Sequence, residues 1–160
     1  MIIPRPPTIS FGVVSAIVTS IGLIIGFGAA GLSKSTMIAG LFIVAFADNL
    51  TDSLSIHLYQ ESEKLEERAA FQATASNFVA RLLVSLSFIA FVLVLSTATT
   101  LVVSLLWGGS VLTAISWLVA KHRRANIAAE IIKHLAVAAV VIASSQAIGI
   151  GTGILRAQIE

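Results

Sequence analysis

The sequence contains no cysteine, few charged side chains and only three prolines, all within the first ten residues. Without cysteine the chain has no disulfide, no thiolate metal site and no cysteine nucleophile, so any metal it binds must have oxygen or nitrogen ligands. Charged residues make up 11% of the chain against 57% hydrophobic residues, and the mean hydropathy is +0.98. These values lie far outside the range of soluble globular domains, so we expect an integral membrane protein.

The net charge of +2 does not indicate a nucleic-acid partner, because the ten Lys and Arg residues are spread along the chain between apolar runs. Membrane topology explains this basicity better. We also expect no enzymatic activity and no permanently bound cofactor. There is no Cys nucleophile, and His57 has no evident Ser and acid partner set beyond its own helix.

Long apolar runs predict an all-α membrane protein with five transmembrane helices in one membrane domain. About 20 residues, at roughly 1.5 Å per residue, cross the hydrocarbon core. The stretch from Asn77 to Ala120 has a single charge, Arg81, and is too long for one span, so two helices must share it. The expected spans are residues 11–32, 36–59, 78–95, 101–120 and 127–154.

The first ten residues hold Pro4, Pro6 and Pro7, so we expect a short non-helical leader before the first span. A cleaved signal peptide is the rival interpretation of the first apolar run. The uncharged stretch from Phe11 to Leu32 is longer than the roughly 7 to 15 apolar residues of a signal peptide, which favours a retained span.

Polar residues mark the expected helix ends. Gly31 can end the first helix, and Ser33 or Ser35 can cap the second. The run 96–100 is the expected turn between the third and fourth spans.

Gly22 and Gly26 in the first span match the small-xxx-small pattern that lets two helices approach closely. Such a match is ordinary packing in most membrane proteins and a homodimer contact in some. The motif therefore leaves both uses open.

Five spans place the two termini on opposite sides, and the basic residues then predict the orientation. One side would hold eight Lys or Arg residues and the other only two. The eight are Arg5, Lys64, Arg68, Arg81, Lys121, Arg123, Arg124 and Lys133, and the two are Lys34 and Arg156. We therefore expect the N-terminus and a charged connector at residues 60–76 in the cytoplasm, and the C-terminus outside or in a lumen.

The second span contains two carboxylates, Asp48 and Asp52, directly after an uncharged run. Four residues apart, they share one helix face, with Ser55 at the next position on that face. An ionised Asp at a helix centre costs about 2.5 to 3.5 kcal/mol to insert, so something inside the protein must compensate the pair. We expect these three residues to form a metal site, with Asp48 near mid-membrane and Asp52 nearer the cytoplasm.

The connector that follows contains Glu61 and Glu63, which would supply metal ions to that site from the cytoplasm. The alternative is a solvated charged connector without a binding role. Glu130 and His134 form a further candidate metal pair, since they share a helix face at i and i+4. A juxtamembrane hydrogen bond or ion pair is the alternative for this second pair.

Several short motifs resemble one known family. Residues 11–20, residues 28–33, and residues 53–56 running into a Glu-rich helix resemble the first two helices of the vacuolar iron transporter family. A tight hairpin between the third and fourth helices and a last helix containing residues 147–149 continue the resemblance. It implies five helices, a cytosolic N-terminus, a homodimer and proton-coupled export of Fe(II) or Mn(II) from the cytosol.

The chain also departs from that family. Its members carry an Asn-Asp-Gly in the first helix, whose Asp ligates the metal, and the matching positions here are Val14, Ser15 and Ala16. The methionine of the second helix is replaced by Ile56, and the nearby Gly-Glu-Tyr becomes residues 59–61, Tyr-Gln-Glu. The long cytosolic metal-binding segment is reduced to a short connector, as in the nodulin-like branch. The second helix would thus carry the membrane carboxylates largely alone.

Three functions remain open at this point. The first is a carrier that binds Fe2+ or Mn2+ through hard carboxylate ligands and couples the transport of the metal to that of protons. The second is a non-transporting membrane scaffold with the same fold, and the third is a proton or small-solute carrier. Expected partners are membrane lipid, metal ions, protons and a second copy of the chain. The membrane would be the inner membrane of a prokaryote, or a vacuolar or other organelle membrane of a eukaryote.

Overall fold

The computed structural model describes residues 6–63 and 66–159, and within these ranges it contains helices and no strand. The elements are α1 (Pro6–Ala29), α2 (Lys34–Ile43), the π-helical turn η1 (Val44–Asp48), α3 (Asn49–Ser62), α4 (Glu67–Val94), α5 (Thr97–Arg123) and α6 (Ile127–Ile159). Because α2, η1 and α3 follow one another without a break, they form one long helix. Five helices of the described chain are therefore long and apolar enough to cross a membrane, which confirms the predicted all-α class and the number of candidate spans.

The first helix begins earlier than the sequence predicts. We expected residues 1–10 to form a non-helical leader, and this is wrong for residues 6–10, since α1 begins at Pro6. Proline is tolerated in the first turn of a helix, where its missing N–H has no intrahelical partner in any case. The remainder of the predicted leader, including Pro4, lies outside the described residues.

The predicted connections between helices are confirmed only in part: the connection after the first helix lies where we expected it, but the predicted turn at residues 96–100 is shorter, because α5 already begins at Thr97. Gly31 follows α1 with a φ of +67°, a left-handed conformation that glycine adopts without strain. The Ser33 hydroxyl accepts the Thr36 N–H at 3.2 Å and caps α2, and the Ser96 hydroxyl accepts the Thr99 N–H at 3.3 Å and caps α5.

Lys34 ties the start of α2 to the end of α4. Its ammonium group donates to the carbonyl oxygens of Leu93 at 3.0 Å and Leu95 at 3.1 Å. These carbonyls lie at the end of α4 and have no intrahelical donor, so the lysine satisfies them.

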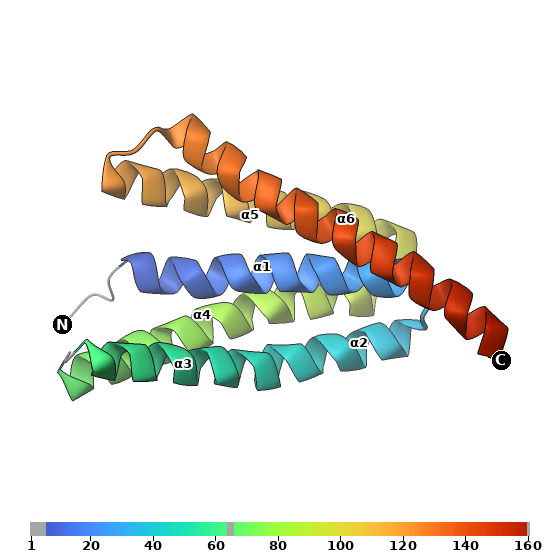
Figure 1. The fold of residues 1–160 in the computed structure, drawn as a ribbon, viewed down its shortest axis with the longest axis horizontal. Coiled ribbons are helices and arrows are strands. Elements are labelled where there is room, and N and C mark those ends of the chain that lie inside the picture. The colour runs from blue at the N-terminus through green and yellow to red at the C-terminus, as the bar shows by residue number, and fades with distance from the viewer. Residues whose placement is uncertain (1–5, 64–65, 160) are drawn as a thin grey trace.

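Helix α1 lies in the middle of the bundle, with α5 and α6 on one side and α2, α3 and α4 on the other (Figure 1). Its apolar residues supply much of the core, including Ile17 and Ile24, which pack with Phe88 and Ile89 of α4. Helix α6 crosses α1 obliquely and is largely exposed along its length (Figure 1). Helix α1 is therefore the element that joins the two halves of the bundle.

Small residues bring α1 and α6 together. A Cβ on Gly22 would lie 3.0 Å from the Ser145 hydroxyl, and a Cβ on Gly149 would overlap the carbonyl oxygen of Gly26. The small-xxx-small motif of the first span is thus occupied by contacts within the chain.

Helical structure continues into both ends of the expected connector at residues 60–76. Helix α3 runs to Ser62 and α4 begins at Glu67. Two of the basic residues used for the predicted orientation, Arg5 and Lys64, lie outside the described residues. A third, Arg81, is buried in the middle of α4 and does not belong to a loop. Without it, the predicted cytoplasmic side holds seven Lys or Arg residues and the other side two.

Candidate functional site

A π-helical turn sets the direction of the second span around Asp48. In an unbroken α-helix, the side chain of Ser53, sixteen positions after Met37, would point about 160° away from that of Met37 around the helix axis. Instead, the buried residues of this helix recur every four positions. They are Met37, Leu41, Ala45, Asn49 and Ser53. The wider turn at η1 absorbs the mismatch, and π-turns of this kind are frequent at functional sites.

Arg81 of α4 holds the two carboxylates of the second span together. Its Nη2 pairs with Oδ2 of Asp48, and its Nη1 pairs with Oδ2 of Asp52. The same Nη1 donates to the hydroxyl of Ser15 on α1 at 2.8 Å. These four residues, which we call the Arg81 cluster, therefore join α1, α4 and the second span.

The Arg81 cluster lies near the middle of two candidate spans. Asp48 is the fifteenth of the 29 residues of Lys34–Ser62, and Arg81 is the fifteenth of the 28 residues of Glu67–Val94. The Arg81 side chain is 2% exposed, whereas those of Asp48 and Asp52 are 44% and 30% exposed. The guanidinium is enclosed by protein, while the carboxylates remain accessible from one side. With both carboxylates ionised, the cluster has a net charge of −1.

The other predicted ligands of this site lie elsewhere. The hydroxyl of Ser55 is exposed and donates to the Thr51 carbonyl of its own helix at 3.0 Å. Glu61 faces His57, with 3.3 Å between its Oε1 and Nε2 of the imidazole. Glu61 is nine residues beyond Asp52, about 13 Å along the helix, and Glu63 is exposed at the end of α3. Neither glutamate can share an ion with Asp52 in this conformation.

Glu130 and His134 lie on α6 and are engaged with neighbours. Lys133 donates to both carboxylate oxygens of Glu130, at 3.1 and 3.3 Å. The Nε2 of His134 is 3.9 Å from Glu130, and its Nδ1 is 2.9 Å from the Ser116 hydroxyl on α5. Because the Ser116 hydroxyl also lies 2.6 Å from the Leu112 carbonyl, it donates there and can accept from Nδ1–H.

Within residues 6–63 and 66–159, no three His, Asp or Glu side chains converge on a position for a metal ion. Asp48 and Asp52 both pair with the guanidinium of Arg81. Any cation bound between them would compete directly with Arg81.

A row of unsatisfied polar atoms runs from the Arg81 cluster along α3 and α4. Seven buried side-chain atoms have no hydrogen-bond partner in the described part of the protein, and all but the Ser104 hydroxyl of α5 belong to α3 or α4. These six are Oδ1 of Asn49, Oγ of Ser53, Nδ1 of His57, Oε1 of Gln60 and both amide atoms of Asn77. We call these five residues the polar seam. Each such atom costs about 1 to 3 kcal/mol when left without a partner. Together they are comparable to the roughly 5 to 15 kcal/mol by which a typical domain is stable.

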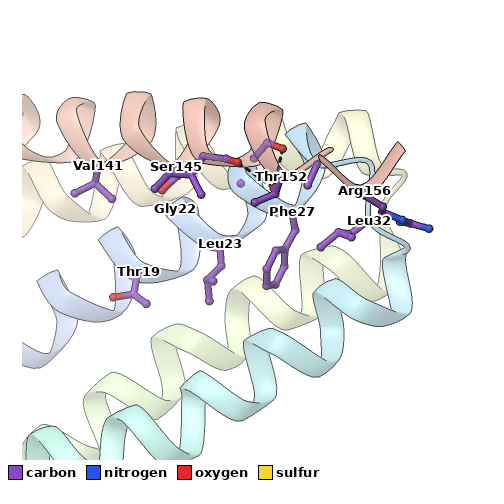
Figure 2. A pocket seen from close by; sticks show the side chains of 13 residues that line it. Thr19, Gly22, Leu23, Phe27, Leu32, Val141, Ser145, Thr152 and Arg156 are labelled. Atoms are coloured by element: carbon purple, nitrogen blue, oxygen red, sulfur yellow. Dashed lines mark hydrogen bonds between the residues drawn. The ribbon is translucent and has the colours of Figure 1, made fainter. Parts of the chain in front are cut away.

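One groove of the described chain lies apart from the Arg81 cluster. It has a volume of about 660 Å³ and lies between α1 and α6, with Val141 and Ser145 on one side and Leu23 and Phe27 on the other (Figure 2). Its lining is mostly apolar, and no residue of the Arg81 cluster contributes to it. An apolar hollow cannot replace the hydration shell of a cation, so we do not assign the ion site to this groove.

Sequence reasoning identified the two aspartates but missed their partner. Arg81 is the single charge in a long apolar stretch, and a lone arginine inside a span is by itself a signal for a buried acidic partner. The π-turn has no comparable signal, since the residues of Val44–Asp48 are ordinary for a helix.

Compared with models of known protein families, with curated proteins and with solved structures, the chain matches none.

Proposed function

We propose that the protein carries a divalent metal cation, Fe2+ or Mn2+, across a membrane, and that Asp48 and Asp52 bind the cation. One observation supports this proposal above the others: a single enclosed guanidinium pairs with two partly open carboxylates at the middle of two spans. Ionisable residues at such a depth are costly and mark ion pathways in many membrane proteins. Carboxylate oxygens are also the ligands that hard divalent cations prefer.

Arg81 then acts as a counter-ion that the cation displaces. Its Nη1 already shares its hydrogen bonds between Asp52 and Ser15, so Ser15 offers a second partner when the carboxylates turn to the metal. The protein thereby avoids leaving a bare guanidinium, which would be expensive in a span.

The charge of the cluster supports coupling to protons. With both carboxylates ionised the net charge is −1, and with a divalent cation added it is +1. One proton on either carboxylate makes the cation-free cluster neutral, which lowers the cost of moving it through the low-dielectric interior. The Arg81 cluster would therefore carry a divalent cation in one direction and a proton in the other.

The direction and assembly belong to the same proposal. The excess of Lys and Arg on one side supports a cytoplasmic N-terminus, and the resemblance to the vacuolar iron transporter family supports export from the cytosol by a homodimer. In a homodimer a second copy could supply further ligands to the open side of Asp48 and Asp52, where one chain has only two carboxylates.

A non-transporting scaffold is the second candidate, and the same ion pairs favour it. Arg81 compensates both aspartates, so the cluster can also be explained as an internal link between α1, α3 and α4. A buried charge pair is weak evidence for stability, however, because apolar residues often pack as well. The scaffold does not explain why the carboxylates stay open.

Metal flux into proteoliposomes separates these candidates. We expect Mn2+ or Fe2+ uptake driven by a pH gradient with the parent protein, and its loss in the Asp48→Asn, Asp52→Asn double variant. The matched control is Glu66→Gln with Glu67→Gln, which removes the same charge from exposed positions at the start of α4. If the double aspartate variant is folded and transports as well as the parent, the site assignment is wrong. If the folded parent transports neither ion, the scaffold is favoured.

A further inference from the structure

A second groove lies between α5 and α6, and we call it the α5–α6 groove. It has a volume of about 690 Å³. Leu105, Leu106 and Trp117 line it from α5, and Ile131 and Leu135 line it from α6. From Leu105 to Trp117 is about 18 Å along the helix, a little more than half of a hydrocarbon core of roughly 30 Å. The groove therefore matches the depth of one leaflet of a membrane.

The wall of this groove is apolar even where it has hydroxyl groups. The Ser110 hydroxyl donates to the Leu106 carbonyl at 2.7 Å. The Thr113 hydroxyl donates to the Gly109 carbonyl, also at 2.7 Å. Both donors are thus satisfied by their own helix, and a polar ligand would gain little from them. The shape and the chemistry of the groove suit a hydrocarbon chain.

One end of the α5–α6 groove meets the basic loop that joins the two helices, at the same end of the bundle as the start of α1 (Figure 1). Trp117 lines this end, and Nζ of Lys121 lies over its ring, 4.9 Å from the ring centroid. Residues 121–129 contain three Lys or Arg residues and no acid. Glu130, the next residue, accepts from Lys133 at 3.1 Å. The loop end of the groove is therefore positively charged.

Two ordinary explanations account for these basic residues but not for the groove beneath them. Basic residues in the last turn of a helix interact favourably with its dipole, and basic loops are typical of the cytoplasmic side of a membrane. Neither explanation requires an apolar groove that begins at the same loop, with a tryptophan at the boundary. A groove that is apolar along its length and cationic at one end is complementary to an amphiphile with an anionic headgroup.

We propose that the α5–α6 groove binds one anionic phospholipid, with an acyl chain along the wall from Leu105 to Trp117 and the phosphate beside Lys121 and Arg123. Basic pockets between transmembrane helices bind anionic headgroups in other membrane proteins. The acyl chain alone would not distinguish one phospholipid from another. The charge of the loop makes the site selective for the anionic ones.

A lipid in this position would hold α6 against α5. Helix α6 is the least buried of the five candidate spans, with 6% of its most apolar stretch buried. At the level of Trp117, the hydrogen bond of 2.9 Å between Ser116 and His134 already joins the two helices. The lipid would fill the open groove beside this contact. This inference does not depend on the proposed metal transport.

Fluorescence quenching in bilayers tests the site. The chain has two tryptophans, so Trp107→Phe leaves Trp117 in the groove as the reporter. The full chain is placed in vesicles of phosphatidylglycerol and phosphatidylcholine in equal amounts, with one of the two lipids brominated on its acyl chain near the headgroup. The ratio of quenching measures the preference of the site at Trp117. We expect phosphatidylglycerol to be preferred by about tenfold or more, because several Lys and Arg residues act on its headgroup.

Two results with this protein would overturn the proposal. Equal quenching by the two lipids would show that Trp117 meets only the lipid of the surrounding bilayer. Quenching by neither lipid would show that a protein surface, such as a second copy of the chain, covers the groove.

Two pairs of variants in the Trp107→Phe background locate the headgroup and the acyl chain. Lys121→Gln should lower the preference by about fivefold, whereas Arg68→Gln, an exposed charge at the start of α4, should leave it unchanged. Gly109→Leu should bring the two lipids close to equal quenching, since it fills the groove from a position with open space around it. Gly151→Leu, which also has open space but lies outside the groove, should behave like its parent. An unchanged preference in Lys121→Gln or in Gly109→Leu would contradict the site.

Discussion

The two sides of α1 are built on opposite principles. Toward α6, Gly22 and Gly26 meet Ser145 and Gly149 so closely that a Cβ on Gly149 would overlap the backbone. Toward α3 and α4, the Ser15 hydroxyl accepts from Arg81, and polar atoms that lack partners are buried nearby. One side is held by close packing of small residues, and the other adds charges and unsatisfied polar groups to an apolar core that includes Ile17 and Ile24.

This contrast indicates that the α3–α4 side of α1 contains the groups that lower the free energy of unfolding. Close packing of small residues can join helices in a bilayer, and the α1–α6 side has the small residues that such packing needs. A second side of the same kind would cost less than buried charges and polar atoms do. The polar side of α1 is therefore the side on which we expect function.

Removing the arginine should have the largest effect on the polar side. Arg81→Leu leaves Asp48 and Asp52 without their counter-charge, so we expect the free energy of unfolding to fall by about 3 kcal/mol, the lower end of the range for broken buried pairs, since the carboxylates are partly open. Reversible denaturation in mixed detergent micelles measures this change.

The control is the triple variant Arg81→Leu, Asp48→Asn, Asp52→Asn, in which no charge remains. It should regain more than half of the lost stability, because the penalty comes from uncompensated charge and not from lost packing. Equal instability of the single and triple variants would contradict this explanation.

The packed side should respond to size instead of charge. In Gly149→Leu the new side chain collides with Gly26, and we expect a loss of about 1 to 3 kcal/mol in the free energy of unfolding, as for other overpacked sites. Gly151→Leu, two positions away with open space around it, is the matched control and should unfold like the parent. Thermal unfolding of both variants in the same detergent makes the comparison, and equal losses would show that α1 and α6 are not closely packed.

We expect the smallest effects from removing one hydroxyl on each side of α1. Ser15→Ala removes the hydrogen bond to Arg81, and we expect a loss of about 0.6 to 1.7 kcal/mol, the range for polar contacts between membrane helices. Ser145→Ala removes a hydroxyl from the packed side and should change stability by less than about 0.5 kcal/mol. Chemical denaturation curves would contradict the distinction if the two serine variants were equally destabilised.

Much of the fold could be predicted from the sequence. Long apolar runs predict the five candidate spans, and Gly31 and Ser33 predict the connection between the first two, because these signals are local. The start of α1 was mispredicted, since prolines that break a helix interior are tolerated in its first turn.

The site was only half predictable. The spacing of Asp48 and Asp52 shows that they share a helix face, but it cannot show which helix compensates them. Arg81 meets them through tertiary packing of α4, and the π-turn at Val44–Asp48 changes the register by a mechanism that leaves no pattern in the residues. The polar seam is likewise visible only when the buried faces of two helices are known.

Direct measurement of Mn2+ affinity tests the central claim, that a cation and Arg81 compete for Asp48 and Asp52. Calorimetry on the purified protein should show binding to the parent, none to the Asp48→Asn, Asp52→Asn variant, and binding to Arg81→Gln that is tighter by about tenfold or more, which corresponds to roughly 1.4 kcal/mol of removed competition. Unchanged affinity in Arg81→Gln, or parent-like affinity in the double aspartate variant, would contradict the account.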